Sequence, residues 1–433
     1  MMKKLHRIAI VGGGAGGLAL ATALGHRLGR KGLARITLVD AGLTHIWKPL
    51  LHEVAAGTIN SFEDELNYFA HSAKNHFEFQ LGRLDGIDRE NKTLHLAPLT
   101  SENGEMIADA RSVAYDTLVL AIGSTSNDFG TQGARDNCIF LDSRPQADRF
   151  HKKFLDMYLQ AHALPEDAPV RPELNIAIVG AGATGVELAA ELHHASHEFV
   201  QYGLDEIDPH HVNITLIEAA PRILPVLPEA ASLAAHAQLE KIGIHVLTGQ
   251  LVTNITPDGL HTKDGLFVPA SLKVWSAGIK APDFLKDIAG LETNRINQIV
   301  VTPTLQTTRD DNIFAFGDCA SCQLPGMERP LPPRAQTAHQ QAKYLVKAMV
   351  ARLEKRPLPA FEYRDYGSLI SLSSANTVGS LTGNINIQGR IARLMYLSLY
   401  RMHQVSLHGF FKTFVLWCKD MLSKTSGPTL KLH

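Results

Sequence analysis

A glycine-rich turn between a short apolar run and a helix-forming segment occurs twice in this chain. The first turn, GGGAGG, joins residues 8–11 to LALATALGHRLG, and the second, GAGATG, joins residues 176–179 to VELAAELHHA. In each copy the next predicted strand ends on an acid, Asp40 or Glu218. The order of strand, GxGxxG turn, helix, strand and acid is typical of a dinucleotide-binding unit. The sequence therefore predicts two bound dinucleotides.

Each residue of the first turn has a separate predicted role. Gly12 makes the tight turn, Gly14 lets the backbone approach a pyrophosphate, and Gly17 lets the helix pack close to the strand. The helix begins near Ala15, and its N-terminus is expected to face the phosphates. Asp40 is expected to bind the hydroxyls of an adenosine ribose. The corresponding residues of the second copy are Gly180, Gly182, Gly185 and Glu218.

A matching strand follows each turn about a hundred residues later, DTLVLAIGS after the first and LKVWSAGI after the second. The cofactor-binding residues predicted at the ends of these strands are Gly123, Ser124 and Gly278. A further strand, IFAFGDCA, carries Asp318. In two-dinucleotide flavoproteins this pattern returns the chain to the first domain and places an aspartate near the flavin's ribityl chain and pyrophosphate.

These patterns predict an α/β fold with two Rossmann-like dinucleotide-binding domains, arranged as in disulfide reductases, and a C-terminal amphipathic region. Residues 1–165 and 300–350 are expected to form a discontinuous FAD-binding domain. Residues 171–297 are expected to form an inserted NADH-binding domain, entered through a proline-rich linker at 162–174. Residues 351–433 form the C-terminal region.

Charge is distributed unevenly along the chain. The formal net charge is −1, which gives no general attraction to nucleic acid, but residues 389–433 hold seven basic residues against one acid, a balance of 7 − 1 = +6. Such a tail suits an acidic partner, with an anionic lipid surface as the expected one. The four cysteines are too few for a disulfide scaffold and fit a reducing cytosol. The glycines of the N-terminal segment argue against a signal peptide, and no apolar run is long enough to span a membrane.

Two further features bear on the chemistry. An acid at Glu218 favours NADH, because it accepts the ribose 2′-OH and repels the 2′-phosphate of NADPH, although Arg222 lies close by. Cys319 and Cys322 form a CxxC sequence, which fits structural thiols, a redox disulfide or half a metal site. No second CxxC and no close His pair completes a zinc set with these cysteines, so no metal site is predicted.

With these elements together, the sequence resembles the type II NADH dehydrogenases, which are membrane-attached NADH:quinone oxidoreductases with FAD. The resemblance covers nearly the whole chain and rests on VGGGAGG, HIWKPLLHEVAAG, YDTLVLAIGSTSNDF, VGAGATGVELAAEL, IFAFGDCA and PRAQTAHQQA. It implies non-covalently bound FAD, oxidation of NADH, and two-electron reduction of a quinone, ubiquinone or menaquinone. It also implies peripheral attachment at the cytoplasmic face of a bacterial inner membrane, without proton pumping.

The resemblance assigns roles to a second set of residues. The segment from Ala335 lies beside the flavin in the family, and its glutamines, here Gln336 and Gln340, border the quinone site. Both amides fall on one helix face, and a flavin-orienting or surface-polar role for Gln340 stays open, as does any role of His339. Glu187 corresponds to a family glutamate that helps to position substrates or relay protons, against the alternative of a plain helix N-terminal glutamate.

The segment HIWKPLLHEVAAG lacks the redox cysteine pair that flavin disulfide reductases carry in this region. The absence of this cysteine pair argues against a disulfide reductase. Lys48 is expected to abut the flavin, whereas a packing role is preferred for His52 and Glu53. Two alternatives remain open: an NADH-dependent reductase of disulfide or sulfide, which would use Cys319 and Cys322, and a flavoprotein that controls a partner through its tail.

The tail mixes basic and aromatic residues at helical spacing. Its apolar positions are Leu407, Phe410, Phe411, Phe414, Trp417 and Met421, with Lys412 and Lys419 elsewhere on the wheel. A helix of this kind is suited to the membrane interface, where quinones are available. The alternative is a helix packed on the protein itself or on a second subunit. The sequence leaves open whether the chain forms a homodimer and which quinone it uses.

Overall fold

A computed structural model describes residues 5–59, 65–101, 103–165, 173–204, 207–372, 377–381, 385–424 and 430. The chain forms two compact units. Unit 1 comprises Met1–Trp47, Glu65–Thr125 and Ile279–Arg364, and unit 2 comprises Lys48–Asp64, Ser126–Gly278 and Asp365–His433. The short strands β12 (Thr125–Ser126) and β21 (Ile279–Lys280) lie at two of the boundaries. Both units combine helices with a parallel sheet, which confirms the α/β prediction.

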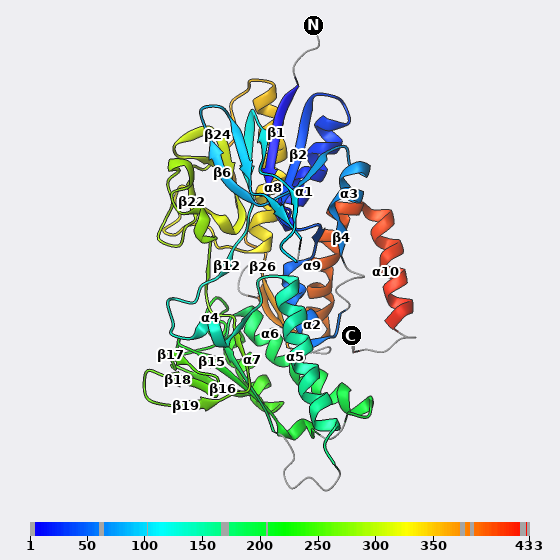
Figure 1. Cartoon of the computed structure of the whole chain (residues 1–433), viewed down its shortest axis with the longest axis vertical. Helices are drawn as coiled ribbons and strands as arrows, with labels where there is room; N and C mark the ends of the chain where they lie inside the picture. The colour runs from blue at the N-terminus through cyan, green and yellow to red at the C-terminus, as the bar shows by residue number, and fades with distance from the viewer. Residues whose placement is uncertain are drawn as a thin grey trace. The chain divides into compact units, whose positions relative to one another are not determined.

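Unit 1, in which Figure 1 labels β22, β24, β1 and β2, is built on a sheet of eight described strands in the order β25-β22-β23-β24-β11-β1-β2-β5. In that order they are Ala320–Cys322, Ile299–Val301, Gln306–Thr307, Asp310–Ala315, Thr117–Leu120, His6–Val11, Ala34–Asp40 and Glu78–Leu81. The central strands run parallel, so that Ile10 lies opposite both Leu38 and Val119. All four residues of β11 are buried. Three of the four are apolar, as expected where helices or loops cover both faces of a parallel sheet.

The remaining elements of unit 1 surround this sheet. Its helices are α1 (Ala15–Leu24), α3 (Tyr68–Lys74) and α8 (Ala335–Leu353). Helix α1 packs along α8, and a Cβ on Gly16 would lie 3.4 Å from Ala338 Cβ of α8 and would collide with Phe316. The small antiparallel sheets are β3 (Thr44–His45) with β4 (Leu66–Asn67), β6 (Leu84–Asp88) with β7 (Thr93–Leu96) and β10 (Arg111–Ala114), and β8 (Leu99–Thr100) with β9 (Met106–Ala108).

Unit 2 repeats the central motif with a sheet of five described strands, all parallel, in the order β13-β20-β14-β15-β16. In that order they are Ile139–Phe140, Leu272–Trp275, Leu174–Val179, Val212–Glu218 and His245–Thr248. Strand β20 lies beside β14 as β11 lies beside β1, in parallel register. The internal repeat predicted from the sequence is therefore confirmed.

Further elements of unit 2 come from three separate parts of the chain. The helices are α2 (Leu51–Ala56), α4 (Ala134–Asn137), α5 (Arg144–His162), α6 (Ala183–Gln201), α7 (Glu229–Lys241), α9 (Arg390–His408) and α10 (Phe410–Lys424). The small sheets are β17 (Val252–Ile255), β18 (Gly259–Thr262) and β19 (Phe267–Pro269), and β26 (Gly367–Ser371), β27 (Thr377–Leu381) and β28 (Ile385–Gln388). Helix α9 contacts all three strands of the second small sheet, and α6 contacts β26.

The boundaries of the units differ from the predicted domain boundaries. Residues 48–64 and 126–165 are predicted in the first domain but belong to unit 2, because β13 is an edge strand of its sheet and α5 packs against α2. Residues 279–297 are predicted in the second domain but belong to unit 1. Residues 351–364 stay in unit 1, where the backbone N–H of Phe361 donates to the carbonyl of Pro303. Residues 365–433 form part of unit 2 rather than a separate region. Most of the predicted linker at 162–174 lies outside the described residues.

The tail is helical, but it is not one helix. Gly409 adopts φ +78° and ψ +166°, which ends α9 and begins α10. The predicted apolar stripe is therefore divided: Leu407 is buried within α9, whereas Phe410 and Phe411 on α10 are 78% and 80% exposed. Periodicity alone could not locate this break, because glycine is tolerated within a helical pattern as well as at its end. Lys431 and the side chains of Arg390 and Lys424, which contribute to the predicted basic tail, lie outside the description.

Candidate functional site

The first glycine turn, in unit 1, is closed to side chains except at its outer edge. Gly12 has φ +103°, and a Cβ there would collide with the carbonyl of Ala121. A Cβ on Gly17 would collide with the carbonyl of Gly12. A Cβ on Gly14, by contrast, would meet no described heavy atom within 4 Å. Gly14 is the N-cap of α1, so the open space lies where a helix N-terminus presents its free N–H groups to an anion.

Asp40, at the end of β2, is held against this turn. Its Oδ2 accepts a hydrogen bond from the backbone N–H of Gly13 at 2.6 Å, and its Oδ1 accepts one from Gly42 at 2.8 Å. Burial raises the pKa of the carboxyl group, while these backbone donors oppose the shift. The Tyr68 hydroxyl donates to the Gly13 carbonyl at 2.7 Å. Sequence reasoning missed Tyr68, which no glycine motif identifies.

The second glycine turn, in unit 2, has the same arrangement of contacts as the first turn. Gly180 has φ +100°, a Cβ on Gly185 would collide with the Gly180 carbonyl, and a Cβ on Gly182 would meet no described atom within 4 Å. Glu218 Oε2 accepts a hydrogen bond from the backbone N–H of Ala181 at 2.8 Å, just as Asp40 accepts one from the N–H of Gly13. Neither α1 nor α6 has an acid in its first turn that would oppose a phosphate. Both turns therefore suit the pyrophosphate of a dinucleotide.

The guanidinium of Arg222, which lies four residues after Glu218, is engaged within its own loop. Its Nη1 donates to the carbonyl of Leu227 at 2.8 Å and its Nη2 to that of Pro225 at 3.0 Å. A guanidinium committed to backbone carbonyls is poorly available for a 2′-phosphate. The proximity of Arg222 to Glu218 in the sequence is the reason to doubt a preference for NADH. These contacts of the guanidinium weaken that reason.

Asp318 lies where the sequence places it, after β24, and accepts a hydrogen bond from the hydroxyl of Ser124 at 2.9 Å. The neighbouring Gly317 has φ +71°, and its N–H donates to the buried amide oxygen of Gln341 at 2.8 Å. Gly123 also has a positive φ, +80°. The structure thus brings together three of the predicted cofactor-binding residues of unit 1 and adds Gln341, which sequence reasoning missed.

Helix α8 starts at Ala335, as the PRAQTAHQQA segment suggests. Gln336 and His339 lie half-buried in its first two turns, and burial lowers the pKa of His339. The amide of Gln340 is engaged at both ends: its Nε2 donates to the carbonyl of Arg364 at 2.8 Å, and its Oε1 accepts the N–H of Arg364 at 3.0 Å. Gln340 therefore fixes the segment that follows α8, which gives weight to the structural alternative for this residue.

Glu187 is buried in unit 2, on the first half of α6. Its Oε1 accepts the backbone N–H of Ser371 at 3.0 Å, and its Oε2 lies 3.6 Å from Nδ1 of His52. Burial is the main cause that raises the pKa of Glu187 to about 8, so the group is mostly protonated at neutral pH. A plain N-terminal glutamate would be solvated, and this one is not.

The other predicted residues of unit 2 lie in less specialised surroundings. Lys48 Nζ lies 3.8 Å from Asp142 Oδ1. Gly278 has φ +64° and packs against the ring of Phe129. Glu191 accepts a long hydrogen bond from the hydroxyl of Thr58, at 3.4 Å. The flavin contact expected of Lys48 stays a prediction.

The cysteines of the CxxC sequence are buried free thiols. Cys319 contacts the carbonyls of Leu120 and Phe316 through Sγ, and Cys322 lies in β25. Burial raises the pKa of each thiol to about 11. Because the reactive species is the thiolate, these surroundings favour the structural interpretation. The described residues contain no group of three or more ligating side chains that could hold a metal ion.

Comparison with known proteins identifies the family. A model described as "Pyridine nucleotide-disulphide oxidoreductase" matches residues 6–342. The chain is 46% identical to the type II NADH:quinone oxidoreductase of Haemophilus influenzae, over 99% of this chain and all of that protein. It is 31% identical to the type II NADH:quinone oxidoreductase of Staphylococcus aureus, over 91% of this chain and 94% of the relative.

Solved structures agree with this fold. NDH2 from Plasmodium falciparum in complex with NADH is similar with a TM-score of 0.83 at 19% identity, covering 99% of this chain and 100% of that one. The sulfide:quinone oxidoreductase of Aquifex aeolicus has a TM-score of 0.72 at 18% identity, covering 93% and 92%. At these identities the likeness concerns the fold alone. Its sequence relatives show that the chain belongs to the type II NADH:quinone oxidoreductases, within the pyridine nucleotide-disulphide oxidoreductase family.

Proposed function

We propose that the protein binds FAD at the glycine turn of unit 1 and NADH at that of unit 2, and that it oxidises NADH and reduces a membrane quinone. The observation that carries the proposal is the duplication of the turn. Each copy has an open position at a helix N-terminus, Gly14 or Gly182, and an acid held beside it, Asp40 or Glu218. A chain that binds one dinucleotide would need only one such turn.

The residues present fit FAD in unit 1. The space in front of Gly14 would take the pyrophosphate, and Asp40 lies beside it for the adenosine ribose. The paired Ser124 and Asp318 form a polar group at the carboxyl ends of β11 and β24, where ligands of parallel sheets bind. When bound, FAD supplies the redox chemistry, accepting a hydride from NADH and returning two electrons.

The chain's own residues would bind and orient NADH in unit 2. The N–H groups at the start of α6 would hold its pyrophosphate, and Glu218 would accept the ribose 2′-OH. Because Arg222 is engaged by carbonyls of its own loop, its guanidinium does not offset the repulsion between Glu218 and a 2′-phosphate. We therefore propose that NADH is strongly preferred to NADPH.

We further propose that the first turns of α8 contribute the quinone site, with Gln336 as an amide donor to a quinone carbonyl. Gln340 would act mainly by holding the segment at Arg364 in place. Quinone reduction consumes one proton from solvent for each NADH, because NADH + quinone + H⁺ gives NAD⁺ + quinol. Glu187 would carry this proton, since its burial keeps it protonated at neutral pH. Because no charge would cross the membrane when the quinone is reduced, the proposed enzyme would not pump protons.

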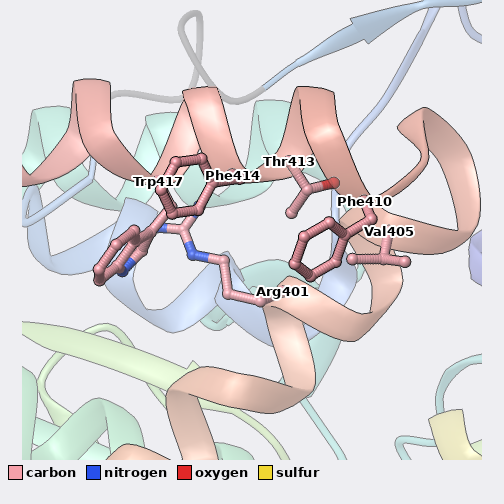
Figure 2. Close-up of a pocket in the computed structure, with 6 residues that line it drawn as sticks. All are labelled: Arg401, Val405, Phe410, Thr413, Phe414 and Trp417. Atoms are coloured by element: carbon pink, nitrogen blue, oxygen red, sulfur yellow. The ribbon is translucent and has the colours of Figure 1, made fainter.

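The hairpin of α9 and α10 is the proposed membrane-binding surface, at the cytoplasmic face of a bacterial inner membrane. Large apolar side chains are exposed along it: Ile391, Leu394, Leu397, Leu399, Met402, Phe410, Phe411, Phe414, Val415, Trp417, Met421 and Leu422. Figure 2 shows a cleft of the hairpin, with Arg401 and Val405 of α9 facing Phe410, Thr413, Phe414 and Trp417 of α10. A cation and aromatic rings side by side suit the level of lipid headgroups.

An ion pair joins the two helices of the hairpin: Arg401 of α9 lies 2.7 Å from Asp420 of α10. At the start of α10 the hydroxyl of Thr413 donates to the Gly409 carbonyl at 2.8 Å. None of the helices among the described residues is long and apolar enough to cross a membrane. The hairpin would therefore bind in the plane of the interface, with its exposed rings among the lipid chains.

The proposal is tested by anaerobic stopped-flow absorbance on protein purified with its flavin. NADH should reduce the flavin rapidly, and a short-chain ubiquinone should reoxidise it rapidly in a second mixing step. Reduction without reoxidation by ubiquinone or menaquinone analogues would leave the NADH site standing and eliminate quinone as the acceptor. Absence of flavin from the folded protein would overturn the assignment of unit 1.

A further inference from the structure

The middle residue of the first glycine turn, Gly13, is held at both of its backbone polar groups. Its N–H donates to Asp40 Oδ2 at 2.6 Å, and its carbonyl accepts a hydrogen bond from the hydroxyl of Tyr68 at 2.7 Å. The next residue, Gly14, is exposed and is the N-cap of α1. Because the C=O and N–H of a planar trans peptide point in opposite directions, the bond from Tyr68 also directs the Gly14 N–H away from the phenol.

Tyr68 is itself held firmly in place within unit 1. It is the first residue of α3, directly after the N-cap Asn67, and its own N–H donates to the carbonyl of Leu43 at 3.0 Å. The side chain is 2% exposed, and its ring stacks on that of Phe79 with the centroids 5.0 Å apart and an angle of 28° between the planes. A ring packed in this way keeps its hydroxyl on the glycine turn.

Tyr68 also accounts for a difference between the two glycine turns. A Cβ on Gly13 would collide with the hydroxyl and the ring of Tyr68, so this position of the first turn requires glycine. The corresponding residue of the second turn is Ala181, whose carbonyl accepts the backbone N–H of Leu224 at 2.8 Å. Leu224 has φ +47°, which is uncommon for a residue with a side chain. Each turn thus has a donor on this carbonyl, a side chain in unit 1 and the backbone in unit 2.

We infer that Tyr68 is a positioning residue for the FAD pyrophosphate: its hydroxyl holds the Gly13–Gly14 peptide so that the Gly14 N–H donates to a phosphate oxygen. The inference rests on the proposed function, in which unit 1 binds FAD at this turn. Without the hydroxyl, the Gly13 carbonyl loses its donor and the peptide is free to rotate, which turns the N–H away from the anion. Burial, the largest cause, raises the pKa of Tyr68 well above its usual value, so the hydroxyl remains a donor.

The test compares Tyr68→Phe with the matched control Tyr344→Phe in the purified, flavin-loaded protein. Tyr344 is a buried tyrosine of unit 1 whose hydroxyl donates to the carbonyl of Pro359 at 2.6 Å, so each change removes a hydroxyl donor from a backbone carbonyl. Release of FAD on serial dilution, followed by flavin fluorescence, gives the dissociation constant. Tyr68→Phe should raise it about tenfold, the effect of one hydrogen bond to a charged group. Tyr344→Phe should leave it unchanged.

The second readout is the ³¹P NMR spectrum of the bound FAD. The pyrophosphate resonances should shift in Tyr68→Phe, because the backbone donor at the phosphate changes direction, and should stay in place in Tyr344→Phe. A merely structural role of the phenol would lower the free energy of unfolding in both variants and would leave the resonances of the bound cofactor where they are in the wild-type protein.

Gly13→Ala is a second variant that keeps the hydroxyl but displaces it with a methyl group, and it should also lose about tenfold or more in affinity for FAD. An unchanged dissociation constant and unchanged resonances in folded Tyr68→Phe would overturn the inference alone, and so would an equal loss of FAD in Tyr344→Phe. A folded wild-type protein that held no FAD would overturn the proposed function, and the inference with it.

Discussion

The carboxylate of Glu218 accepts a hydrogen bond from the backbone N–H of Ala181 over a distance of 2.8 Å. This contact holds the acid at the mouth of the second glycine turn, and a second one, from the N–H of Ala220, fixes its other oxygen. Asp40 makes the equivalent pair of contacts, with Gly13 and Gly42, in unit 1. The two acids are therefore parts of the turns themselves, as well as candidate ligands of a ribose.

Glu218→Gln should weaken the discrimination between NADH and NADPH. The amide keeps the size of the side chain but removes the negative charge that repels a 2′-phosphate, so kcat/KM for NADPH should rise about tenfold relative to that for NADH. Steady-state rates with both nucleotides measure the ratio. Glu229→Gln, an exposed acid at the start of α7, serves as the control and should leave it unchanged. An unaltered ratio in Glu218→Gln would mean that selectivity is set elsewhere.

Gly14→Ala and Gly182→Ala should separate the two nucleotide sites. A methyl group at either position enters open space, so both variants should fold, but it would occupy room assigned to a pyrophosphate. Gly14→Ala should lose roughly tenfold or more in affinity for FAD. Gly182→Ala should keep FAD and raise KM for NADH by a similar factor. Flavin absorbance per protein and NADH titrations measure the two effects.

The control for these glycine variants is Gly86→Ala, where a Cβ would make an ordinary contact with His95. It should change neither FAD content nor KM. Loss of FAD from Gly182→Ala, with retention in Gly14→Ala, would reverse the assignment of the two units. Gly12→Ala should fail to fold, because its φ of +103° and the Ala121 carbonyl both exclude a side chain.

Cys319→Ala combined with Cys322→Ala should retain NADH:quinone turnover within about twofold, because both thiols are buried and their pKa values are raised to about 11. The free energy of unfolding should fall by about 1–2 kcal/mol for the small cavities left behind. Turnover and denaturant titration of the same preparation test both parts. Abolished turnover in a folded double variant would return the disulfide reductase alternative to consideration.

Phe410→Ser with Phe411→Ser should reduce binding to vesicles that contain anionic phospholipid. These rings are 78% and 80% exposed, and each would contribute roughly 1.5–3 kcal/mol on transfer into lipid, so the partition coefficient should fall at least tenfold. Met106→Ser with Ile107→Ser removes comparably exposed apolar side chains from β9 in unit 1 and is the matched control. Equal binding by both double variants in a sedimentation assay would argue against the hairpin as the anchor.

Glu187→Gln should stabilise the protein at alkaline pH. The folded-state pKa of Glu187 is raised from 4.5 to about 8, mainly by burial, so the native state binds the proton more tightly than the unfolded chain does. Stability from this group is fully present below about pH 4.5 and is lost as the pH rises through 8. Above pH 8 the neutral amide should raise the free energy of unfolding by roughly 2–4 kcal/mol. A difference that did not depend on pH would indicate a carboxyl group with an ordinary pKa.

The sequence by itself determined the local units of this protein. The strand, glycine turn, helix and acid are contiguous in the chain, and the positive φ of Gly12 and Gly180 and the tight packing at Gly17 and Gly185 follow from short-range sterics. The twofold occurrence of this pattern was enough to predict the α/β fold and its repeat. The motifs were also enough to indicate the family, since they combine short segments whose spacing is fixed.

Only the tertiary structure decided which distant segments meet. His52, Glu187 and Ser371 are each more than a hundred residues apart, and no periodicity relates α2, α6 and β26. Likewise, Gln340 and Gln341 are neighbours in the sequence but differ by about 100° around α8. The first therefore contacts Arg364, whereas the second is buried against Gly317. Such pairings depend on how whole helices pack on the sheets, and this long-range arrangement is not encoded in the local pattern of any one segment.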